Sequence, residues 1–484
     1  MTAHTRPDPP RRILDGVSSP SPTSVGPGPA PADDAAPEGW RAAVDRELAA
    51  LFPSEGVGRW RPLGLVLAAV ATAAAALLQL GRQAVVAPWE VMWAEDAAPY
   101  LTDARALPLL ESVPRTFHDY FHVYPRVVAE LSTLFHPVRA AEIFVLAAAA
   151  TAGAVAVTVY RASSGHVREP LLRALLGALV VLSPVAGNEL MNNLANLQWY
   201  FCLAAFWVLL WRPSTVLARV WQVFLLAVAA LSAPLTVVFV PLALLRVVAR
   251  RRHPAELVAP VVFLAGTALQ LVSMLRATLP AGPAFDAGLA VQTYAQRVAL
   301  TALVGDRHAG RLWEAHGWLW PVVAVLVLGA FVAYAAGRSK ARTRWPALAA
   351  TVTSVGFLVV AVSGRAGWDT IVWDAGSQHF LMGRYLLVPV ALAQAVVVLA
   401  LDDAPERVAD GTWRRLAAVV AGLLVFGAGA DYTAVNQRSD GPEWRAGIAE
   451  AAEECRTTPG LEAAEVKAAP VLLDFAAAIP CEDI

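Results

Sequence analysis

The sequence predicts an all-α polytopic membrane protein with about eleven membrane-crossing helices. Of its 484 residues 57% are hydrophobic and only 16% are charged, which is a large apolar excess over an ordinary soluble domain. The apolar residues also form uninterrupted Ala, Leu and Val runs, long enough to cross the hydrocarbon core of a bilayer. Because these runs do not alternate with period two, helices are expected to do the spanning.

Residues 1–60 precede the first long apolar run. Residues 1–40 are rich in Pro, Ser, Gly and Ala and carry almost no large apolar side chains, which predicts a disordered cytosolic tail. Residues 40–53 can form a short amphipathic helix. No cleavable signal peptide is expected, because the apolar run Leu63–Leu80 lies too deep in the chain and is expected to remain in the membrane.

Basic residues near helix ends predict the orientation, since they are retained on the cytoplasmic side. Five basic clusters flank apolar runs and are expected in the cytosol: Arg161 to Arg173, Arg212 to Arg219, Arg246 to Arg252, Arg338 to Arg344, and Arg414 with Arg415. The resulting path, from a cytosolic N-terminus through a transmembrane domain over 61–430, has spans at 63–84, 139–160, 171–187, 197–211, 217–231, 235–249, 256–278, 317–336, 346–363, 384–401 and 416–430.

This topology implies a multi-pass protein of an inner or plasma membrane with an extracytoplasmic C-terminus. The outer face receives a long first loop and four further segments: 85–138, 188–196, 280–316, 364–383 and the tail 431–484. The net charge of −1 gives no argument for a nucleic-acid partner.

The tail is expected to form a small α/β unit. Asp440 to Arg456 has helical spacing, and Pro470 to Phe475 is expected to form a short strand. Cys455 and Cys481 fit a disulfide in an extracytoplasmic tail, which would join helix to strand. Two cysteines without a bond are also compatible with the sequence.

Adjacent acids stand in the first outer loop, shortly after the first span. Glu95 and Asp96 can act as a general base toward an acceptor hydroxyl, or can coordinate a divalent cation that neutralises a phosphate leaving group. Solvated loop acids or a helix N-cap explain the same pair.

Two histidines follow in the same loop. His118 and His122 are four residues apart and would share one face of a helix. With Asp96 they are compatible with a metal site for a cation such as Mg²⁺ or Mn²⁺, but so few ligands do not name a metal. Interleaved aromatics are also expected of an interfacial helix at the level of the lipid headgroups.

The outer segment before the fourth span is rich in amides. Asn192, Asn196, Gln198 and Trp199 can hydrogen-bond sugar hydroxyls or hold the first loop in place. Helix capping and hydrogen bonding between helices are the alternatives.

Basic and aromatic residues meet near the tenth span. Arg384 begins that span and Tyr385 follows it, while Arg365 lies in the preceding loop. A guanidinium there can grip a phosphate, or can extend to the outer headgroups. Because Walker, Rossmann, HExxH and GxSxG motifs are missing from the sequence, a phosphate donor is expected to be carried on a lipid.

These features together resemble the GT-C superfamily of integral membrane glycosyltransferases, over roughly residues 60–430. The resemblance rests on the acidic pair Glu95 and Asp96 after the first helix, on the many further helices, and on Arg384 and Tyr385 followed by Pro389. In that superfamily the first-loop acid is catalytic, the donor is a sugar on polyprenyl phosphate, and transfer occurs on the outer face.

The resemblance implies roles for individual residues. Asp96 becomes the leading catalytic base, with Glu95 as the neighbour that can replace it, and Arg384 and Arg365 bind the donor phosphate. The stretch from Asn188 to Gln198 resembles actinobacterial-type members, which leaves sugar and acceptor open. The remaining expected substrate-binding residues are Tyr385, Asn192, Asn196, Gln198, Trp199 and His118.

The sequence therefore favours a polyprenyl-phosphate-sugar-dependent glycosyltransferase. Its partners would be membrane lipids, a lipid-linked sugar donor, and a glycan, lipid or protein acceptor of the cell envelope. A transporter or flippase of a lipid-linked saccharide is one alternative, but it predicts charges deep in mid-helix positions, and the sequence has few. A non-catalytic envelope assembly factor is the other.

Overall fold

The computed structural model describes residues 40–55, 62–187, 189–276, 284–368, 371–372, 383–403, 410–433 and 437–484. The chain divides into the units Met1–Ala43 and Val44–Ile484, and every helix and strand after residue 51 belongs to the second. The helix α1 (Trp40–Leu51) coincides with the amphipathic helix expected over 40–53. The disordered tail expected over 1–40 lies outside the described residues, apart from Trp40.

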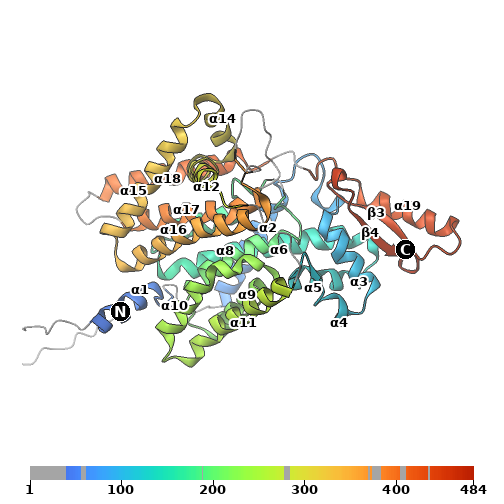
Figure 1. Ribbon diagram of the computed structural model, residues 1–484, viewed down its shortest axis with the longest axis horizontal. Coiled ribbons are helices and arrows are strands. Elements are labelled where there is room, and N and C mark those ends of the chain that lie inside the picture. Colours follow the sequence, from blue (N-terminus) through green and yellow to red (C-terminus); the bar gives the residue numbers. More distant parts are fainter. Residues whose placement is uncertain are drawn as a thin grey trace, which may run out of the picture. The chain divides into compact units, whose positions relative to one another are not determined.

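Each of the eleven expected spans overlaps a helix of the described residues, and Figure 1 shows these helices packed into a bundle. Seven stretches are long and apolar enough to cross a membrane, with bounds Leu63–Leu80, Pro137–Gly165, Pro254–Arg276, Leu319–Arg338, Ala341–Gly364, Gly383–Asp402 and Gly411–Ala430. The protein is therefore a helical protein with the character of a polytopic membrane protein, whereas the count of eleven crossings stays a prediction. The helices are α2 (Pro62–Leu80), α6 (Ala140–Ala162), α7 (Pro170–Val181), α8 (Leu197–Leu210), α9 (Val216–Ser232), α10 (Val240–Arg250), α11 (Pro254–Arg276), α15 (Leu319–Arg338), α16 (Ala341–Ala361), α17 (Leu387–Asp402) and α18 (Asp410–Ala430).

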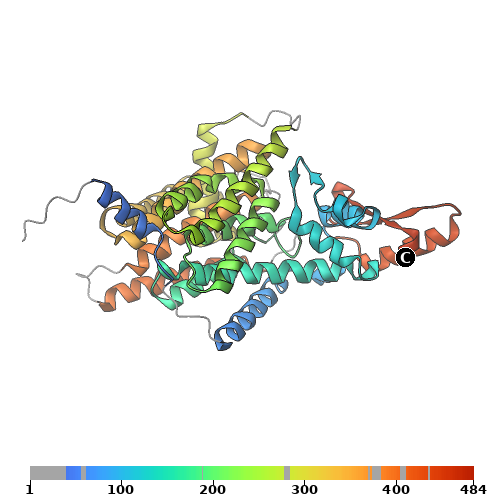
Figure 2. The same cartoon turned by 90° about the horizontal axis from the view of Figure 1, so that it is seen from below.

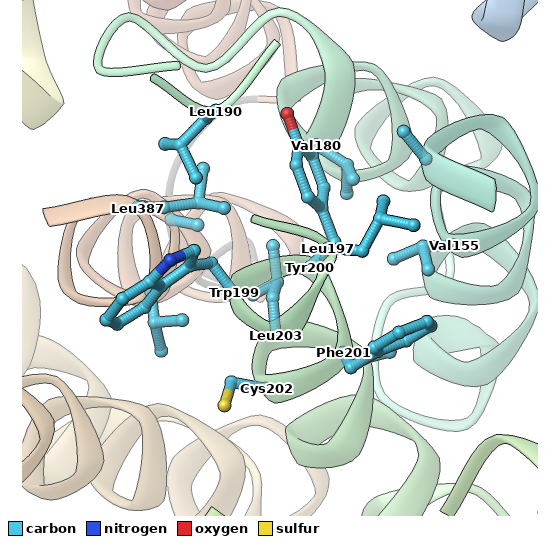
Figure 3. Close-up of a cluster of buried hydrophobic side chains, with 14 of the residues drawn as sticks. Val155, Val180, Leu190, Leu197, Trp199, Tyr200, Phe201, Cys202, Leu203 and Leu387 are labelled. Atoms are coloured by element: carbon cyan, nitrogen blue, oxygen red, sulfur yellow. The ribbon is translucent and has the colours of Figure 1, made fainter. Parts of the chain in front are cut away.

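Two helices, α8 and α17, form the centre of the bundle. Both are apolar around their whole circumference and almost completely buried, as expected of helices enclosed by other helices. The helix α17 packs against α15, α16 and α8, and α8 packs against α6 and α9. Figure 3 shows α8 side chains such as Trp199, Phe201 and Leu203 spread around the helix, with Leu387 of α17 nearby.

The outer helix α2 lies against α6, and small residues permit this close contact. A Cβ atom at Gly153 of α6 would lie 2.5 Å from the carbonyl oxygen of Thr72 in α2. No side chain fits there, so glycine sets the spacing of the two backbones. Most of the apolar side chains of α2 remain exposed on the opposite face, as expected of a helix that faces lipid.

The segment after α2 folds into short elements beside the tail. These are η1 (Pro88–Glu90), η2 (Asp96–Leu101), α3 (Thr102–Ala106), α4 (Leu109–Ser112), β1 (Thr116–Phe117), β2 (Tyr120–Phe121), α5 (Val123–Ser132) and η3 (Pro137–Arg139). The helix considered for 117–122 is wrong, because β1 and β2 form an antiparallel hairpin. Its turn residues His118 and Asp119 have φ values of 51° and 69°, the left-handed conformation that a tight hairpin turn requires.

The described parts of the remaining connections are also largely helical. The expected outer segment 280–316 contains three helical elements in a row and a fourth, α14, where the chain approaches α15. The bounds are η4 (Ser163–Gly165), η5 (Pro234–Phe239), α12 (Ala287–Thr293), η6 (Tyr294–Leu300), α13 (Thr301–Val304), α14 (Asp306–His316), η7 (Val362–Ala366) and η8 (Gly383–Leu386).

The tail is an α/β unit, but its strands are not where the sequence analysis put one. Helix α19 (Trp444–Thr457) packs on β3 (Ala463–Lys467), which pairs antiparallel with β4 (Ala476–Pro480). The strand expected over 470–475 is wrong: the segment is the connection between the two strands and contains the helical turn η9 (Val471–Leu473). Pro470 lacks a backbone N–H and so favours a turn over a ladder position.

A disulfide stabilises the tail internally, and hydrogen bonds and packing contacts join it to the elements of the first loop. Cys455 at the end of α19 forms a disulfide with Cys481, in the turn η10 (Cys481–Asp483) directly after β4. The backbone N–H of Ala94 donates to the carbonyl oxygen of Ala469 at 2.6 Å. The strand β4 contacts α3 and η2, and both views show these elements next to one another (Figures 1 and 2).

Candidate functional site

Segments far apart in the sequence meet at the end of the bundle that carries the tail. They are the turn η2 after α2, the loop 189–196 between α7 and α8, the turn η8 before α17, and residues 437–441 of the tail. Figure 3 shows Leu190 of the loop pointing toward Leu387 at the start of α17. Four hydrogen bonds from the guanidinium of Arg438, a clamp made by the carboxylate of Asp96, and an ion pair of Arg384 join these segments.

Asp96 is buried and holds the loop 189–196. Its side-chain oxygens accept hydrogen bonds from the backbone N–H groups of Leu194 and Ala195, at 3.0 Å and 2.9 Å, and the residue is only 1% exposed. Burial raises the pKa of Asp96 to about 7, against the opposing effects of these two hydrogen bonds and of Arg438. Asp96 therefore positions a loop, with each of its side-chain oxygens engaged by a backbone N–H group.

Arg438 of the tail is the strongest connection and was not singled out in the sequence. Its guanidinium is fully buried and donates to four carbonyl oxygens, those of Pro88, Val91, Met191 and Asn192. Burial lowers the pKa of Arg438 to about 10, and Asp96 opposes this effect. In sequence Arg438 stands in a polar stretch that looks like solvent-exposed tail, so no pattern marked it.

The side chain of Glu95 has different surroundings from those of its neighbour Asp96. One of its carboxylate oxygens is buried and makes no hydrogen bond with any residue that the structure describes. Its charge acts on Tyr100, Glu189 and Arg384, so these groups lie around it. An unpaired buried carboxylate oxygen is costly, which makes Glu95 the acid of the pair with free capacity to bind or deprotonate a ligand.

Arg384 lies within the electrostatic influence of Glu95 and pairs with Glu189. The distance from Arg384 Nε to Glu189 Oε2 is 3.3 Å, and the side chain of Arg384 remains 29% exposed. Burial raises the pKa of Glu189 to about 7; Arg384 opposes the shift, and Glu95 adds to it. We refer to Glu95, Glu189, Arg384 and Tyr385 as the Glu95 cluster. Of these four residues the sequence analysis did not select Glu189.

Aromatic side chains support the Glu95 cluster. The guanidinium of Arg384 lies 5.3 Å from the centroid of the Tyr385 ring, and Tyr385 makes an edge-to-face contact with Trp199 at 5.1 Å. Both rings are almost fully buried. The two rings therefore pack beneath the guanidinium of Arg384, and neither ring face is exposed for stacking on a sugar.

Most amides of the loop 189–196 bond within the loop. Asn193 and Asn196 donate to the carbonyl oxygen of Glu189, and Trp199 donates to Asn196. Gln198 donates to the carbonyl oxygen of Ala195 at 3.3 Å. Asn196, Gln198 and Trp199 therefore shape the loop, which is the structural alternative that the sequence left open.

Asn192 is the exception among these amides. Its residue is 1% exposed, and neither its side-chain oxygen nor its nitrogen has a hydrogen-bond partner among the described residues. Its φ of 53° places it in the left-handed region, a conformation that asparagine tolerates better than most residues. A buried amide with both atoms unpaired is expected to bind a water molecule or a ligand.

The histidines are separated by the hairpin. His122 is buried and hydrogen-bonds through Nδ1 to the hydroxyl of Tyr100 at 2.7 Å, whereas His118 is exposed at the turn beside Phe117. Within the described ranges no three His, Cys, Asp or Glu side chains form a group that could hold a metal ion. The set of Asp96, His118 and His122 considered as metal ligands is therefore not assembled, because Asp96 binds backbone amides and the hairpin turns His118 away.

The expected phosphate site includes Arg365, in the segment before η8 and α17. The side chain of Arg365 and the loop positions Asp369, Trp373, Asp374, Gln378 and His379 lie outside the described residues. Asn188 also lies outside them. All four residues of the Glu95 cluster belong to the part of the chain that the structure describes.

Comparison with known proteins gives no further assignment: no family model, no curated protein and no solved structure matches the chain. The functional argument therefore rests on the arrangement of the residues themselves.

The raised pKa of Asp96 predicts a pH-dependent stability. An unfolded aspartate titrates near pH 4 and folded Asp96 near pH 7, so between these values the folded state binds more protons and stability falls as pH rises. We expect the thermal midpoint of the wild type in detergent to fall from about pH 5 to 7 more steeply than that of Asp96→Asn. Parallel curves would contradict the assignment, and Glu90→Gln, at an exposed acid nearby, should follow the wild type.

Proposed function

We propose that the protein is a GT-C-like membrane glycosyltransferase. It transfers a sugar from a polyprenyl phosphate to a cell-envelope glycan, lipid or protein on the extracytoplasmic face. The observation that carries the proposal is the Glu95 cluster, in which a carboxylate with an unpaired oxygen and a partly exposed guanidinium lie at the same end of an apolar helix bundle.

The chemistry requires both charges. Glu95 takes the proton of the acceptor hydroxyl while the acceptor oxygen forms a bond to the anomeric carbon. The bond from that carbon to the phosphate oxygen breaks, and the phosphate leaves on its lipid with its negative charge stabilised by Arg384. General-base and electrostatic contributions of this kind each account for several powers of ten in rate.

Glu189 determines when Arg384 can bind the phosphate. In the structure Glu189 forms an ion pair with the guanidinium of Arg384, with 3.3 Å between Oε2 and Nε. Its pKa of about 7 means that protonation near neutral pH removes the competing charge. An arriving phosphate favours that protonation, because two anions on one guanidinium repel each other. Glu189 thus neutralises Arg384 in the free protein and releases it to the donor.

The proposed sidedness has support at both ends of the bundle. At one end ion pairs and a hydrogen bond join three expected cytosolic clusters. Glu256 pairs with Arg212 and Arg250, whereas Glu55 pairs with Arg161 and accepts a hydrogen bond from the hydroxyl of Ser214. At the other end the tail, with its disulfide, contacts the loop that carries Glu189 through the hydrogen bonds of Arg438 to Met191 and Asn192. A disulfide is typical of an extracytoplasmic compartment.

The test is transfer of radiolabelled sugar from a panel of polyprenyl phosphate sugars by the full chain in nanodiscs. We expect transfer from at least one donor, and a loss of about 100-fold or more for Arg384→Gln. Arg445→Gln, an exposed arginine of α19, is the matched control and should retain full activity. Absence of transfer from every donor, or full activity of Arg384→Gln, would overturn the proposal.

A further inference from the structure

A cavity lies apart from the Glu95 cluster, between the β1–β2 hairpin and the last turns of α11. Its volume is about 300 Å³, and it is lined by Thr116, Asp119, Phe121, Leu269, Val272, Ser273 and Arg276. None of the residues proposed for sugar transfer lines it. The cavity is therefore considered separately from sugar transfer.

The wall of this cavity is held in place by hydrogen bonds. The buried amide of Gln270 in α11 donates to the carbonyl oxygen of Phe121 and accepts from its backbone N–H, at 3.0 Å and 2.8 Å. The hydroxyl of Ser273 donates to the carbonyl oxygen of Asp119 at 2.9 Å. Since these bonds fix the hairpin on α11, the cavity is formed before any ligand arrives.

The lining changes from apolar to polar along α11. Leu269 and Val272 are 49% and 43% exposed and belong to a stretch apolar enough to cross a membrane. Arg276 is the last residue of that stretch, and the hairpin adds Thr116 and Asp119 beside it. An apolar wall that ends in charged and hydroxyl groups matches a lipid, whose chain lies along the helix and whose head lies at its end.

The two charges of the cavity have free capacity. Arg276 is exposed at the end of α11 and Asp119 is half-buried. Within the part of the chain that the structure describes, Arg276 makes no ion pair or side-chain hydrogen bond, and the same holds for the carboxylate of Asp119. A guanidinium binds a phosphate through paired N–H donors. A carboxylate accepts hydrogen bonds from hydroxyl groups. A single ligand that carries both groups would satisfy both side chains.

We propose that this cavity binds a lipid phosphate with a hydroxyl-bearing head: Arg276 pairs with the phosphate, Asp119 accepts from the head hydroxyls, and the chain lies along Leu269 and Val272. The inference goes beyond sugar transfer, because binding here requires no reaction. Two lipids share this chemistry, phosphatidylglycerol and a polyprenyl phosphate sugar.

The experiment is native mass spectrometry of the full chain, released from detergent with one added lipid at a time. The probes are phosphatidylglycerol, polyprenyl phosphate mannose, and diacylglycerol as a lipid without phosphate. We expect at least one phosphate probe to be retained over diacylglycerol, and Arg276→Gln to lower its retained fraction about tenfold, as loss of a charged hydrogen bond predicts. Asp119→Asn should lower it by a smaller factor.

The matched control is Arg139→Gln, which removes an exposed arginine at the end of another span and should leave retention unchanged. Dependence of polyprenyl phosphate mannose alone on Arg276 supports the proposal and identifies a lipid-linked sugar; dependence of phosphatidylglycerol supports it and identifies a bilayer lipid. Equal retention by the wild type, Arg276→Gln and Asp119→Asn overturns it. Because no readout involves transfer, an inactive protein that still retains lipid through Arg276 would refute the proposed function and leave this inference standing.

Discussion

Glu95→Gln is expected to lower sugar transfer at least about 100-fold, the usual range for loss of a general base. The substitution keeps the size of the side chain and removes only its ability to take a proton. Since one oxygen of Glu95 makes no hydrogen bond among the described residues, folding should change little. Initial rates and thermal midpoints measured on the same preparation check both expectations.

Asp96→Asn provides the contrast to Glu95→Gln. Asparagine keeps one acceptor oxygen but places an amide N–H₂ against the second of the two backbone donors from Leu194 and Ala195. We therefore expect lower stability, with transfer reduced only as far as the loop 189–196 is displaced. If Glu95→Gln stays active while Asp96→Asn folds normally and is inactive, the assignment of the two acids is reversed.

Arg438→Met is expected to cause the largest loss of stability, at least about 3 kcal/mol, because it leaves buried carbonyl oxygens without donors. The guanidinium makes four such bonds, with distances from 2.6 Å to 3.4 Å. Methionine fills a similar volume, so the effect reports the lost hydrogen bonds rather than a cavity. Thermal unfolding followed by tryptophan fluorescence measures it.

Two further variants make the Arg438 test specific. Arg456→Met changes an exposed arginine of the same tail, 73% exposed at the side chain, and should be neutral. Arg438→Lys retains the charge but not the planar fork, and should fall between the wild type and Arg438→Met. A wild-type midpoint for Arg438→Met would show that the tail does not hold the loops together.

The helices could be predicted because spans depend on one strong property, the length of an apolar run. All eleven expected spans overlap helices, including the short α10, and seven of these helices lie in stretches long and apolar enough to cross a membrane. The local elements were harder. Aromatics interleaved with histidines fit a helix or a strand, and His118-Asp119 is a weaker turn signal than Asn-Gly. In the tail, the apolar residues around Pro470 have the composition of a strand, but they form the connection between β3 and β4.

The site could be predicted only in part, for a geometric reason. The acidic pair was evident, but which acid turns inward depends on the irregular turn η2, where Ala98 departs from helical geometry with φ −131° and ψ 112°. In a regular helix or strand the sequence spacing of two residues tells whether their side chains share a face. In an irregular turn such as η2 it does not, so the directions of Glu95 and Asp96 could not be deduced. Arg438 and Glu189 are single charges in polar stretches. Their importance lies in contacts with residues far away in the sequence.

The connection through Arg438 has a consequence for biosynthesis. Arg438 follows the last apolar helix, whereas the carbonyl groups it binds belong to segments near residues 90 and 191. Those segments are translated and inserted long before Arg438 leaves the ribosome. Until Arg438 has been translated, the loop that carries Glu189 has the clamp of Asp96 but lacks the hydrogen bonds that Arg438 donates to Met191 and Asn192.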